Sequence, residues 1–479
     1  MQVTAVDDGC DGPKLHFMTS ADTVLFERIW SELGGAPLAP DSLIWTGAER
    51  LLLSAYDVAG FASATVASAA AGIAAVHSVR TGEPARAIRV DRGHAAVAFR
   101  SERYVTPIGW SLPSGWDPLA GDYPTRDGWI RLHTNYRHHR EAVLRVLGVP
   151  ESREEVARAV RGWSAEDLEG AVVGEGGCAA RSRTATAWAA HPQGQSVARE
   201  PLVAVTALPT SPPELRDVQG PPLAGIRVLD LTRVVAGPVC TRVLAAFGAD
   251  VLRVDPRGFE EVGALLPEMT VGKRRTFLDL RATPDRLAFE RLITGAHVMV
   301  HGYRSDALER LGFGAARRRA LNPSLIDVSL DAYGFMGPWA NRRGFDSLVQ
   351  MSVGIADRGQ QATGADRPVP LPAQALDHGT GYLLAAATCR ALVRVLVDRE
   401  ASEVHLSLAR TAKLLVDLGD SGEMRGPDMT PDEVERCSET ASTAFGPVTR
   451  VRCPVRIDGN DPCWTVAAGP LGVDAPVWR

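Results

Sequence analysis

Lysine, cysteine and an excess of one charge are scarce in this 479-residue sequence. Lysine occurs only at Lys14, Lys273 and Lys413, and arginine supplies the other basic residues. A net charge of −5 gives no reason to expect nucleic acid or an anionic membrane as a partner. The seven cysteines are odd in number and form no CxxC pair. This argues against a disulfide framework or a zinc site and favours a reducing, cytoplasmic location.

Sequence motifs for common cofactors and for targeting are also missing. The sequence contains no GxGxxG, P-loop, GxSxG or HExxH motif, so we expect no tightly bound cofactor. The N-terminus has no basic region followed by an apolar core, which predicts no signal peptide. Since no apolar run approaches the roughly 20 residues of a membrane span, we expect no membrane partner.

Three histidines, His133, His138 and His139, are the best candidates for metal ligands. His138 and His139 are adjacent, so helical geometry would direct them to different sides. Only Glu141 stands at helical spacing from His138, which gives too few ligands for a site. We therefore expect no metal.

One segment in the second half of the sequence has an imperfect repeat in the first half. Asp377 precedes an alanine-rich helical pattern over 383–396, and an alternating, strand-like run follows at 404–408. In the first half, 62–79 is alanine-rich and helical in pattern, and 87–90 resumes as a strand. When the two segments are aligned without gaps, Ala59 falls opposite Asp377. This suggests that one half kept chemistry that the other lost.

Asp377 itself has two interpretations. An aspartate just before a helix is most often an N-cap, which accepts a hydrogen bond from a backbone N–H two or three residues on. The alternative is a nucleophilic carboxylate, activated by its position and by burial. Gly379 and Gly381 would then allow a ligand to approach the backbone closely.

At 479 residues, with 45% hydrophobic and 23% charged residues, the chain has the length and composition of a globular protein of two or more domains. Proline and glycine residues around 209–222 predict an internal boundary. Beyond it, apolar strand patterns alternate with helical ones. Strands are predicted at 226–231, 251–254, 276–280, 297–301 and 325–330. This alternation predicts a doubly wound sheet with its sites at the carboxyl ends of the strands.

Basic residues follow or flank several of these strands. They are Arg257, Lys273, Arg274, Arg275, Arg304 and Arg310. If they converge where the strands end, they would suit a phosphorylated ligand. The alternative is that most of them are solvated surface residues.

The second half resembles the class III CoA-transferases, the family of formyl-CoA transferase, carnitine CoA-transferase and the α-methylacyl-CoA racemases. The matching stretches follow the family's order over about 200 residues. They are 222–232, Ala236–Gly237–Pro238, 244–251, Gly272–Lys273–Arg274, 302–312, Leu321–Asn322–Pro323, 333–338, Gly344–Phe345–Asp346, and Asp377 with its glycines.

The resemblance implies an α/β protein with a Rossmann-like, doubly wound large domain and a smaller α+β domain, in the family's interlocked fold. Here the order is changed, as in a fused and trimmed duplication. The expected parts are a loose tail (1–20), a degenerate large-domain remnant without the catalytic aspartate (21–125), the small domain (126–208), a linker (209–221), the large domain (222–418) and a C-terminal return segment (419–479). Such a chain would be a pseudo-dimeric monomer or a homodimer.

The resemblance also implies a mechanism and a set of site residues. Asp377 would attack an acyl-CoA thioester and carry CoA as an aspartyl-CoA thioester to an acceptor carboxylic acid. Coenzyme A would lie along Val235 and Ala236. Its phosphates would be bound by Arg257, Lys273, Arg304 and Arg310, and its adenine or pantetheine by Gly302 and Tyr303.

Two other functions remain open. A racemase of this family would carry a histidine where this chain has Phe345, so a racemase or isomerase would need a different base. A non-catalytic CoA-binding subunit is the third hypothesis, because the chain is so rearranged. The glycine-rich loop of the transferases has only a poor candidate in Gly174–Glu175–Gly176–Gly177. Steroid, fatty and small dicarboxylic acids all remain possible substrates.

Overall fold

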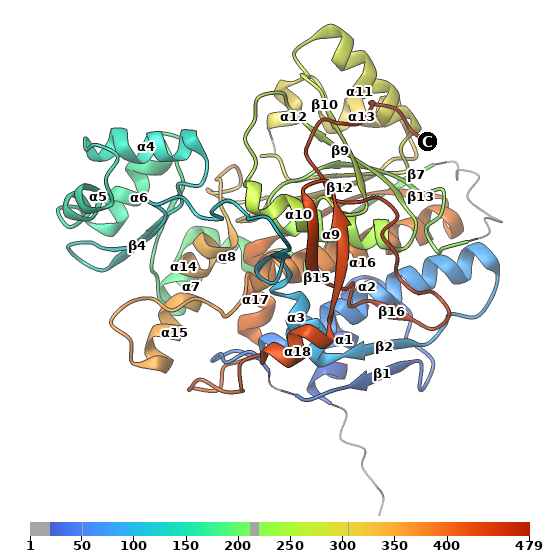
Figure 1. The fold of residues 1–479 in the computed structure, drawn as a ribbon, viewed down its shortest axis with the longest axis horizontal. Helices are drawn as coiled ribbons and strands as arrows, with labels where there is room; N and C mark the ends of the chain where they lie inside the picture. Colours follow the sequence, from blue (N-terminus) through green and yellow to red (C-terminus); the bar gives the residue numbers. More distant parts are fainter. Residues whose placement is uncertain (1–19, 50, 211–219, 305) are drawn as a thin grey trace, which may run out of the picture.

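A computed structural model describes residues 20–49, 51–210, 220–304 and 306–479 (Figure 1). The expected tail and linker lie almost entirely outside these residues. The centre of the molecule is a seven-stranded sheet of order β10-β9-β8-β11-β12-β13-β7. Its strands are β7 (Ala204–Pro209), β8 (Arg227–Leu231), β9 (Asp250–Asp255), β10 (Lys273–Phe277), β11 (Val298–His301), β12 (Ile326–Asp331) and β13 (Glu400–Ser407).

All neighbouring strands in this sheet are parallel except β7, which pairs antiparallel with β13. Helices pack on both sides, which buries strands such as β8 and β11 and explains their continuous apolar runs. The helices of this region are α9 (Ala236–Ala246), α10 (Leu266–Met269), α11 (Thr283–Gly295), α12 (Ala307–Arg310), α13 (Ala315–Leu321), α14 (Asp346–Ser352), α15 (Ile355–Thr363), α16 (Ala375–Val397) and α17 (Leu408–Asp417), with the short turn η2 (Gly263–Leu265). The doubly wound α/β prediction is confirmed.

Two boundaries differ from those that the sequence predicted. The strand expected at 276–280 begins three residues earlier, because β10 pairs with β9 from Lys273 opposite Val251. The last residues of the range expected for the small domain form β7, an edge strand of the central sheet. The chain therefore returns to the central sheet before residue 208.

A smaller lobe lies at the left of Figure 1. It contains the antiparallel sheet β4-β5-β6 and three helices that share one apolar core. The elements are β4 (Gly121–Pro124), β5 (Trp129–Leu132), α4 (Arg137–Leu147), α5 (Arg153–Val160), α6 (Ala165–Gly174) and β6 (Ala179–Arg181), followed by α7 (Ala185–Ala190) and α8 (Pro192–Arg199). The antiparallel sheet and helices α4, α5 and α6 thus form one unit.

The N-terminal segment repeats part of the central unit. Its elements are α1 (Ala21–Glu32), β1 (Leu43–Thr46), α2 (Val58–Thr81), β2 (Ile88–Asp91), α3 (Arg92–Ala98), η1 (Ser101–Arg103) and β3 (Thr106–Pro107). Strands β1 and β2 are parallel and flank the long helix α2 in sequence, as β12 and β13 flank α16. Helices α2 and α16 lie against each other. A Cβ atom on Gly72 of α2 would lie 2.9 Å from the Cβ atom of Cys389 on α16.

The same two helices have the length and apolar composition of membrane spans, which corrects the expectation that no apolar run approaches that length. However, 94% of the apolar window in α2 and 83% of that in α16 is buried inside the structure. Their composition is therefore explained by burial in the shared core.

The C-terminal segment links the two halves. Its elements are α18 (Pro431–Arg436), β14 (Ser438–Thr443), β15 (Gly446–Val451) and β16 (Arg456–Ile457). Strand β15 pairs with β3, and β16 pairs with β2, both in the N-terminal segment. Farther on, the Trp464 indole donates to the Arg242 carbonyl at 2.8 Å, and that of Trp478 donates to the Leu292 carbonyl at 3.0 Å. The last part of the chain is thus held by hydrogen bonds against helices α9 and α11.

Candidate functional site

Asp377 lies in the first turn of α16, but it does not cap that helix. Asp346, the first residue of α14, accepts hydrogen bonds from the backbone N–H groups of Leu376 and Asp377, at 2.9 and 3.1 Å. The other oxygen of Asp346 accepts from the Gln350 amide. The helix end is thus satisfied from a different element, and the N-cap hypothesis for Asp377 is wrong.

The carboxylate of Asp377 is left without a hydrogen-bond donor among the residues that the structure describes. The residue is only 7% exposed. Burial and then the charges of Asp346 and Glu102 raise the pKa of Asp377 well above its usual value. Burial also raises the pKa of Asp346, to about 6. A buried carboxyl group without a charged partner is costly, which is typical of a functional site.

Glu102, from the turn η1 in the first half, completes this group of acids. It lies 2.9 Å from the imidazole Nε2 of His378, the residue next to Asp377. Burial acts to raise the pKa of Glu102, but the charge and hydrogen bond of His378 outweigh it and lower the pKa. Glu102 therefore stays ionised beside Asp377.

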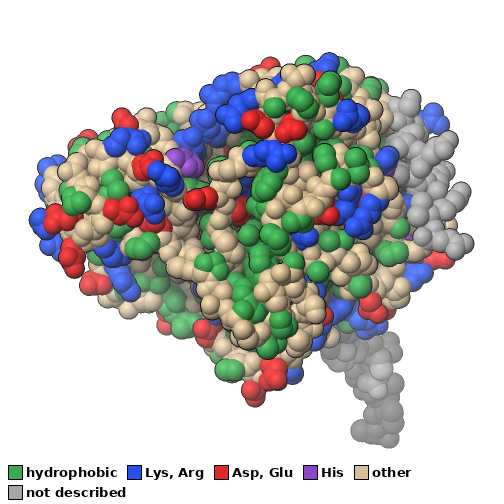
Figure 2. Space-filling model, turned by 45° about the horizontal axis from the view of Figure 1, so that its top comes forward, with side chains coloured by type: hydrophobic (Ala, Val, Ile, Leu, Met, Phe, Trp, Pro, Cys, Tyr) green, Lys and Arg blue, Asp and Glu red, His purple; other side chains and the backbone are tan. Residues whose placement is uncertain are grey.

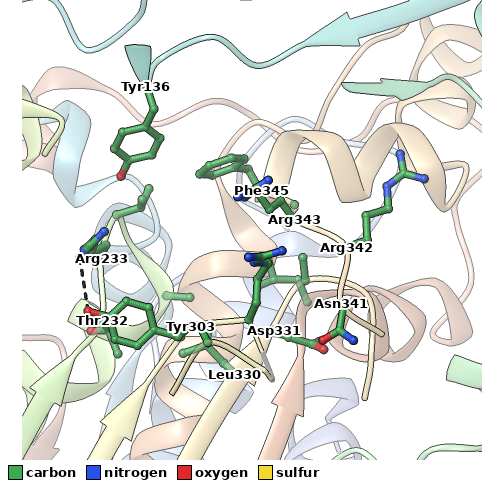
Figure 3. Close-up of a pocket in the computed structure, with 18 of the residues that line it drawn as sticks. Tyr136, Thr232, Arg233, Tyr303, Leu330, Asp331, Asn341, Arg342, Arg343 and Phe345 are labelled. Atoms are coloured by element: carbon green, nitrogen blue, oxygen red, sulfur yellow. Dashed lines mark hydrogen bonds between the residues drawn. The ribbon is translucent and has the colours of Figure 1, made fainter. Parts of the chain in front are cut away.

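Asp377 faces two cavities. The first, of about 350 Å³, lies over the carboxyl ends of β8, β11 and β12 (Figure 3). Tyr136 and Phe345 lie on one side of this cavity, and Tyr303, Leu330 and Asp331 lie on the other. This is the position that a doubly wound sheet favours for a ligand.

Four arginines line the first cavity: Arg233, Arg304, Arg342 and Arg343. Arg233 is fixed by several neighbours, since its guanidinium lies 3.7 Å from the centre of the Phe259 ring and 3.5 Å from the carboxylate of Asp255. Burial and then the charge of Arg343 lower the pKa of Arg304, which shows that positive charges crowd here. Figure 2 shows Lys and Arg side chains gathered where the smaller lobe meets the main body, with a histidine at the same boundary.

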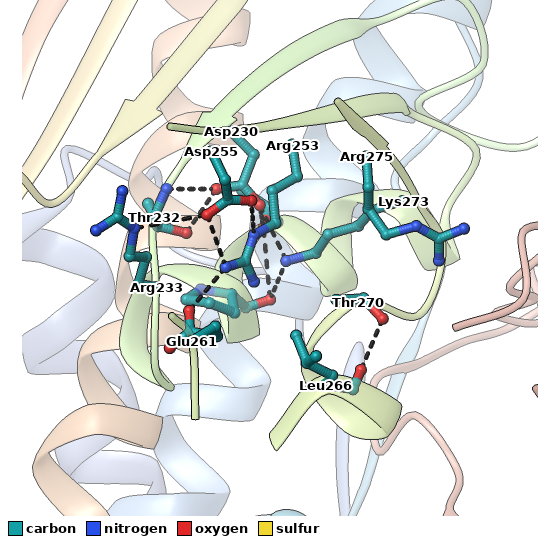
Figure 4. Close-up of polar contacts among 12 residues, drawn as sticks. Asp230, Thr232, Arg233, Arg253, Asp255, Glu261, Leu266, Thr270, Lys273 and Arg275 are labelled. Carbon is teal, nitrogen blue, oxygen red and sulfur yellow. Dashed lines mark hydrogen bonds and ion pairs between the residues drawn. The ribbon is translucent and has the colours of Figure 1, made fainter. Parts of the chain in front are cut away.

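A buried polar network underlies this cavity (Figure 4). Lys273 is fully buried, and its Nζ donates to Asp230 at 3.0 Å and to the Pro238 carbonyl at 3.2 Å. Burial lowers the pKa of Lys273 to about 8, against the opposing charge of Asp230. The prediction that Lys273 binds a phosphate is wrong, because its amine is buried between Asp230 of β8 and the Pro238 carbonyl in the first turn of α9.

Arg253 carries the same network toward the smaller lobe. It is fully buried and forms ion pairs with Asp255 at 2.8 Å and Glu261 at 2.7 Å. The Tyr136 hydroxyl donates to the same Glu261 at 2.9 Å. A wall of the cavity that comes from the smaller lobe is thereby held by the large domain.

The remaining predicted contact residues divide into two groups. Ala236, Gly302, Tyr303 and Arg304 line the first cavity. Val235 is buried and lines neither cavity. Arg257 is 66% exposed at a neighbouring hollow of about 300 Å³, and Arg310 is 59% exposed and paired with Asp306 at 3.1 Å.

Gly379 and Gly381 serve packing between helices. A Cβ atom on Gly379 would lie 2.4 Å from the Phe61 ring of α2, and one on Gly381 would lie 2.6 Å from the Ala236 carbonyl. A side chain at either position would separate helices that touch. The expected approach of a ligand to these glycines is therefore not what the structure shows.

The second cavity, of about 610 Å³, is lined mainly by residues before 136 and by the segment 262–265. Both cavities share Tyr136, Val234, Phe345 and Asp377 in their walls. Val234 has φ of 65°, a left-handed conformation that a β-branched residue rarely adopts. Strain held at the junction of two cavities is typical of a functional position.

Sequence reasoning missed the contribution of the first half to this site. No motif marks Glu102 or Tyr136, which lie far from Asp377 in sequence. Asp346 had a signal, because it belongs to the quoted stretch Gly344–Phe345–Asp346. Arg233 also had one, since it lies in the loop after the first strand of the α/β unit.

The histidines also lie around this junction. His138 and His139 line the first cavity, with ring centres 4.1 Å apart, and His133 lines the second and stacks on Phe345 at 3.7 Å. The prediction that helical geometry directs His138 and His139 to different sides is therefore wrong, because both line the first cavity. Burial lowers the pKa of His133 to about 3, so its imidazole is neutral. Within the described ranges, no group of three or more His, Cys, Asp or Glu is placed to hold a metal.

Comparison with known proteins gives the following similarities. Residues 223–442 match the model of a family described as CoA-transferase family III. The chain is 35% identical over 177 residues to the acetyl-coenzyme A transferase nodX of Hypoxylon pulicicidum, covering 36% of this chain and 30% of that protein. It is 33% identical over 199 residues to the probable fatty acyl-CoA transferase Rv3272 of Mycobacterium tuberculosis, covering 39% and 48%.

A crystal structure of Rv3272 is 30% identical and covers 42% of this chain and 60% of that chain, with a TM-score of 0.38. The chain thus spans less than half the length of the two curated relatives.

Proposed function

We propose that this chain, whose residues 223–442 belong to CoA-transferase family III, moves coenzyme A from an acyl-CoA to a carboxylic acid through Asp377. The observation that carries the proposal is the buried carboxylate of Asp377, which has no hydrogen-bond donor among the described residues and lies at the junction of two cavities. A nucleophile that reacts with two substrates in turn must be accessible to both of them, and two adjoining cavities give that access. The relatives named as acyl-CoA or acetyl-CoA transferases support the reaction class.

The reaction consists of four balanced steps. The Asp377 carboxylate attacks the thioester carbonyl, the C–S bond breaks, and CoA leaves as a thiolate with an acyl-aspartyl anhydride in its place. The thiolate attacks the aspartyl carbonyl and releases the donor acid as a carboxylate, leaving an aspartyl-CoA thioester. The acceptor carboxylate displaces the thiolate to form a new anhydride. The thiolate then attacks the acceptor's carbonyl and frees Asp377.

The surroundings of Asp377 suit these steps. A carboxylate is a weak nucleophile, and desolvation without a hydrogen-bond donor raises its reactivity. Asp346 fixes the first turn of α16, so the nucleophile is positioned by backbone hydrogen bonds that do not use its own oxygens. No net proton is transferred, so the reaction needs no general acid or general base.

The first cavity is the proposed place for the coenzyme. Arg233, Arg304 and Arg343 supply positive charge beside it. The neighbouring hollow, which shares Leu231, Phe259 and Tyr303 with it, brings Arg257 and Arg281 to its edge. The negative phosphates of CoA would lie on this side, since arginine forks match phosphate oxygens.

The test is to trap the intermediate. Purified protein incubated with an acyl-CoA should give an Asp377-containing peptide that hydroxylamine converts to a hydroxamate, and Asp377→Ala should give none. Peptide mass spectrometry reads out both. Undiminished transfer by Asp377→Ala would overturn the mechanism.

A racemase or isomerase is the second candidate, and one observation favours it. His133 is a neutral imidazole that lines the second cavity together with Asp377, and it stacks directly on Phe345. An imidazole is therefore present beside Phe345, which cannot carry a proton, although burial lowers the pKa of His133 to about 3 and makes it a weak base. Incorporation of deuterium from solvent at the α-carbon of an acyl-CoA, lost in His133→Phe, would establish this reaction in place of transfer. Absence of any CoA binding would remove both.

We also propose that one chain forms a complete site. Glu102, Tyr136 and Asp377 come from different parts of a single chain and surround the same space. This supports a pseudo-dimeric monomer over a homodimer with shared sites. Light scattering on the active fraction should give one chain's mass. Activity confined to a dimeric fraction would contradict the proposal.

A further inference from the structure

The second cavity differs from the first in both size and chemistry. It encloses about 610 Å³ and is lined by Glu102, Arg103, Leu112, Pro113, Gly115, Trp116, Arg131, His133, Asn135, Val262, Ala264 and Leu265 in addition to residues near Asp377. Ligand cavities in proteins commonly enclose about 300–1,000 Å³. A cavity of this size has room for an organic acid far larger than a two-carbon or four-carbon one.

Trp116 is the largest apolar side chain in the wall of this cavity. It is 46% exposed, although large aromatic side chains are usually more deeply buried in a protein of this size. The guanidinium of Arg131 lies 5.5 Å from the centre of its ring, and the His133 ring meets it edge-on at 6.0 Å. These neighbours fix the indole while leaving much of it uncovered, which is the geometry of a stacking surface.

The cations of the second cavity are already engaged. Arg131 donates to Asp122 at 2.7 Å. Arg103 lies 3.5 Å from Glu102 and donates to the Pro372 carbonyl at 3.0 Å. A second carboxylate on a substrate would have to compete with these partners and would also meet the charge of Glu102. The cavity therefore disfavours small dicarboxylates.

Two nitrogen atoms near the cavity wall have no hydrogen-bond partner among the residues that the structure describes. The Nε of Arg131 is buried without a hydrogen bond, and so is the Nδ1 of the neutral His133. Unsatisfied buried polar atoms are costly. Both atoms lie beneath the accessible surface of the cavity, so a bound molecule would not contact them.

We infer that the second cavity receives the carbon body of both acids in the reaction, and that these are bulky apolar monocarboxylic acids containing a ring, which stacks on Trp116. This inference rests on the proposed function, because Asp377 at the junction must hold the acyl carbonyl while CoA occupies the first cavity. The residues that decide specificity then come from the first half, with Trp116 as the main one.

The experiment compares acceptor acids at a fixed, saturating acyl-CoA donor. The panel is cyclohexanecarboxylate, phenylacetate and 2-naphthylacetate against oxalate and succinate. We expect kcat/KM for the ring acids to exceed that for succinate by at least about tenfold, which corresponds to one well-placed apolar contact. A preference for oxalate or succinate would overturn the inference.

Variants at the wall test the role of Trp116. Trp116→Ala should raise KM for the ring acids about tenfold or more, and Trp116→Phe should restore most of the loss. The amount of trapped Asp377 adduct formed from a small acyl-CoA such as acetyl-CoA should be unchanged in Ile108→Ala. Ile108→Ala is the matched control, because Ile108 is 44% exposed in the same segment and lines neither cavity. Equal effects of Trp116→Ala on ring acids and on succinate would contradict stacking.

A failure of the proposed function can be distinguished from a failure of the inference about the second cavity. If no adduct forms on Asp377 with any acyl-CoA, the transfer mechanism fails, but binding still tests the cavity. Ring acids should then raise the melting temperature of the wild type and of Ile108→Ala, but not that of Trp116→Ala. A thermal shift that is the same in all three proteins would overturn the assignment of the cavity.

Discussion

Helices α2 and α16 are alike in length, composition and burial, and they differ in how their first turns are capped. Both are long, alanine-rich and buried, and each leads to a strand and then to a helix capped by a strand-end residue, Asp91 in one case and Ser407 in the other. At the N-terminus of α2, its own Asp57 accepts from the Gly60 N–H. At the N-terminus of α16, the acceptor is instead Asp346 of α14, which accepts from the Leu376 N–H.

The source of the cap decides what the first turn can do. Because α2 is capped locally, its first turn closes on itself, and Ala59 is packed at 2% exposure. Because Asp346 of α14 caps α16, the carboxylate of Asp377 is not needed as a cap, and it faces the two cavities. The first turn of α2 thus serves packing, whereas the first turn of α16 also borders the two cavities.

The largest effect should come from making α16 resemble α2. Asp377→Ala should reduce CoA transfer by about 1,000-fold or more, since the covalent route is removed. The melting temperature should stay equal or rise, because a buried, unpaired carboxyl group is lost. Steady-state kinetics and thermal denaturation of the same preparation measure both. Retained transfer would show that the two helices do not differ in chemistry.

The reverse change should harm α2 without creating a site. Ala59→Asp would place a carboxylate among buried apolar neighbours without a cavity, and we expect a loss of about 3 kcal/mol in the free energy of unfolding. Ala75→Asp, at a partly exposed position of the same helix, should cost much less. Urea denaturation compares the two variants. An Ala59→Asp protein as stable as the wild type would show that space and polarity exist beside α2.

The two caps provide a matched pair. Asp346→Ala should cost about 2 kcal/mol of stability and lower kcat by about 10- to 100-fold, because the first turn that carries Asp377 shifts. Asp57→Ala should cost about 1 kcal/mol and leave kcat near that of the wild type. Unfolding curves and kcat are measured on both. Equal losses of kcat would mean that both helix ends control the site.

The smallest effect concerns pH. The raised pKa of Asp377 means that the folded state binds its proton more tightly than the unfolded state. Stability from this group therefore falls as pH rises from the ordinary carboxyl pKa through the folded one, while transfer increases as the nucleophile ionises.

Glu102→Gln removes a neighbouring negative charge, so the acidic limb of the kcat profile should move to lower pH. Asp377→Asn should lose the corresponding part of the pH dependence of stability. An acidic limb that stays in place in Glu102→Gln would show that Glu102 does not influence the nucleophile.

The sequence predicted the parallel α/β unit because apolar strand and helix patterns alternate there, and local patterning is enough for that. It also pointed to Asp377. It failed for Lys273, because a lone lysine after a glycine gives no sign that its amine is buried against Asp230. It failed for Gly379 and Gly381 as well, since a small residue suits a close ligand and a close helix equally.

By itself, the sequence determined the order of elements, the family-like stretch of the second half, and the candidate nucleophile. Only the tertiary structure decided what surrounds that nucleophile. Glu102 reaches His378 across 276 residues of chain, and Trp116 and Tyr136 reach the same space from the first half. Burial, charge and cavity shape depend on distances through space, and no local pattern in a sequence specifies which distant segments will meet.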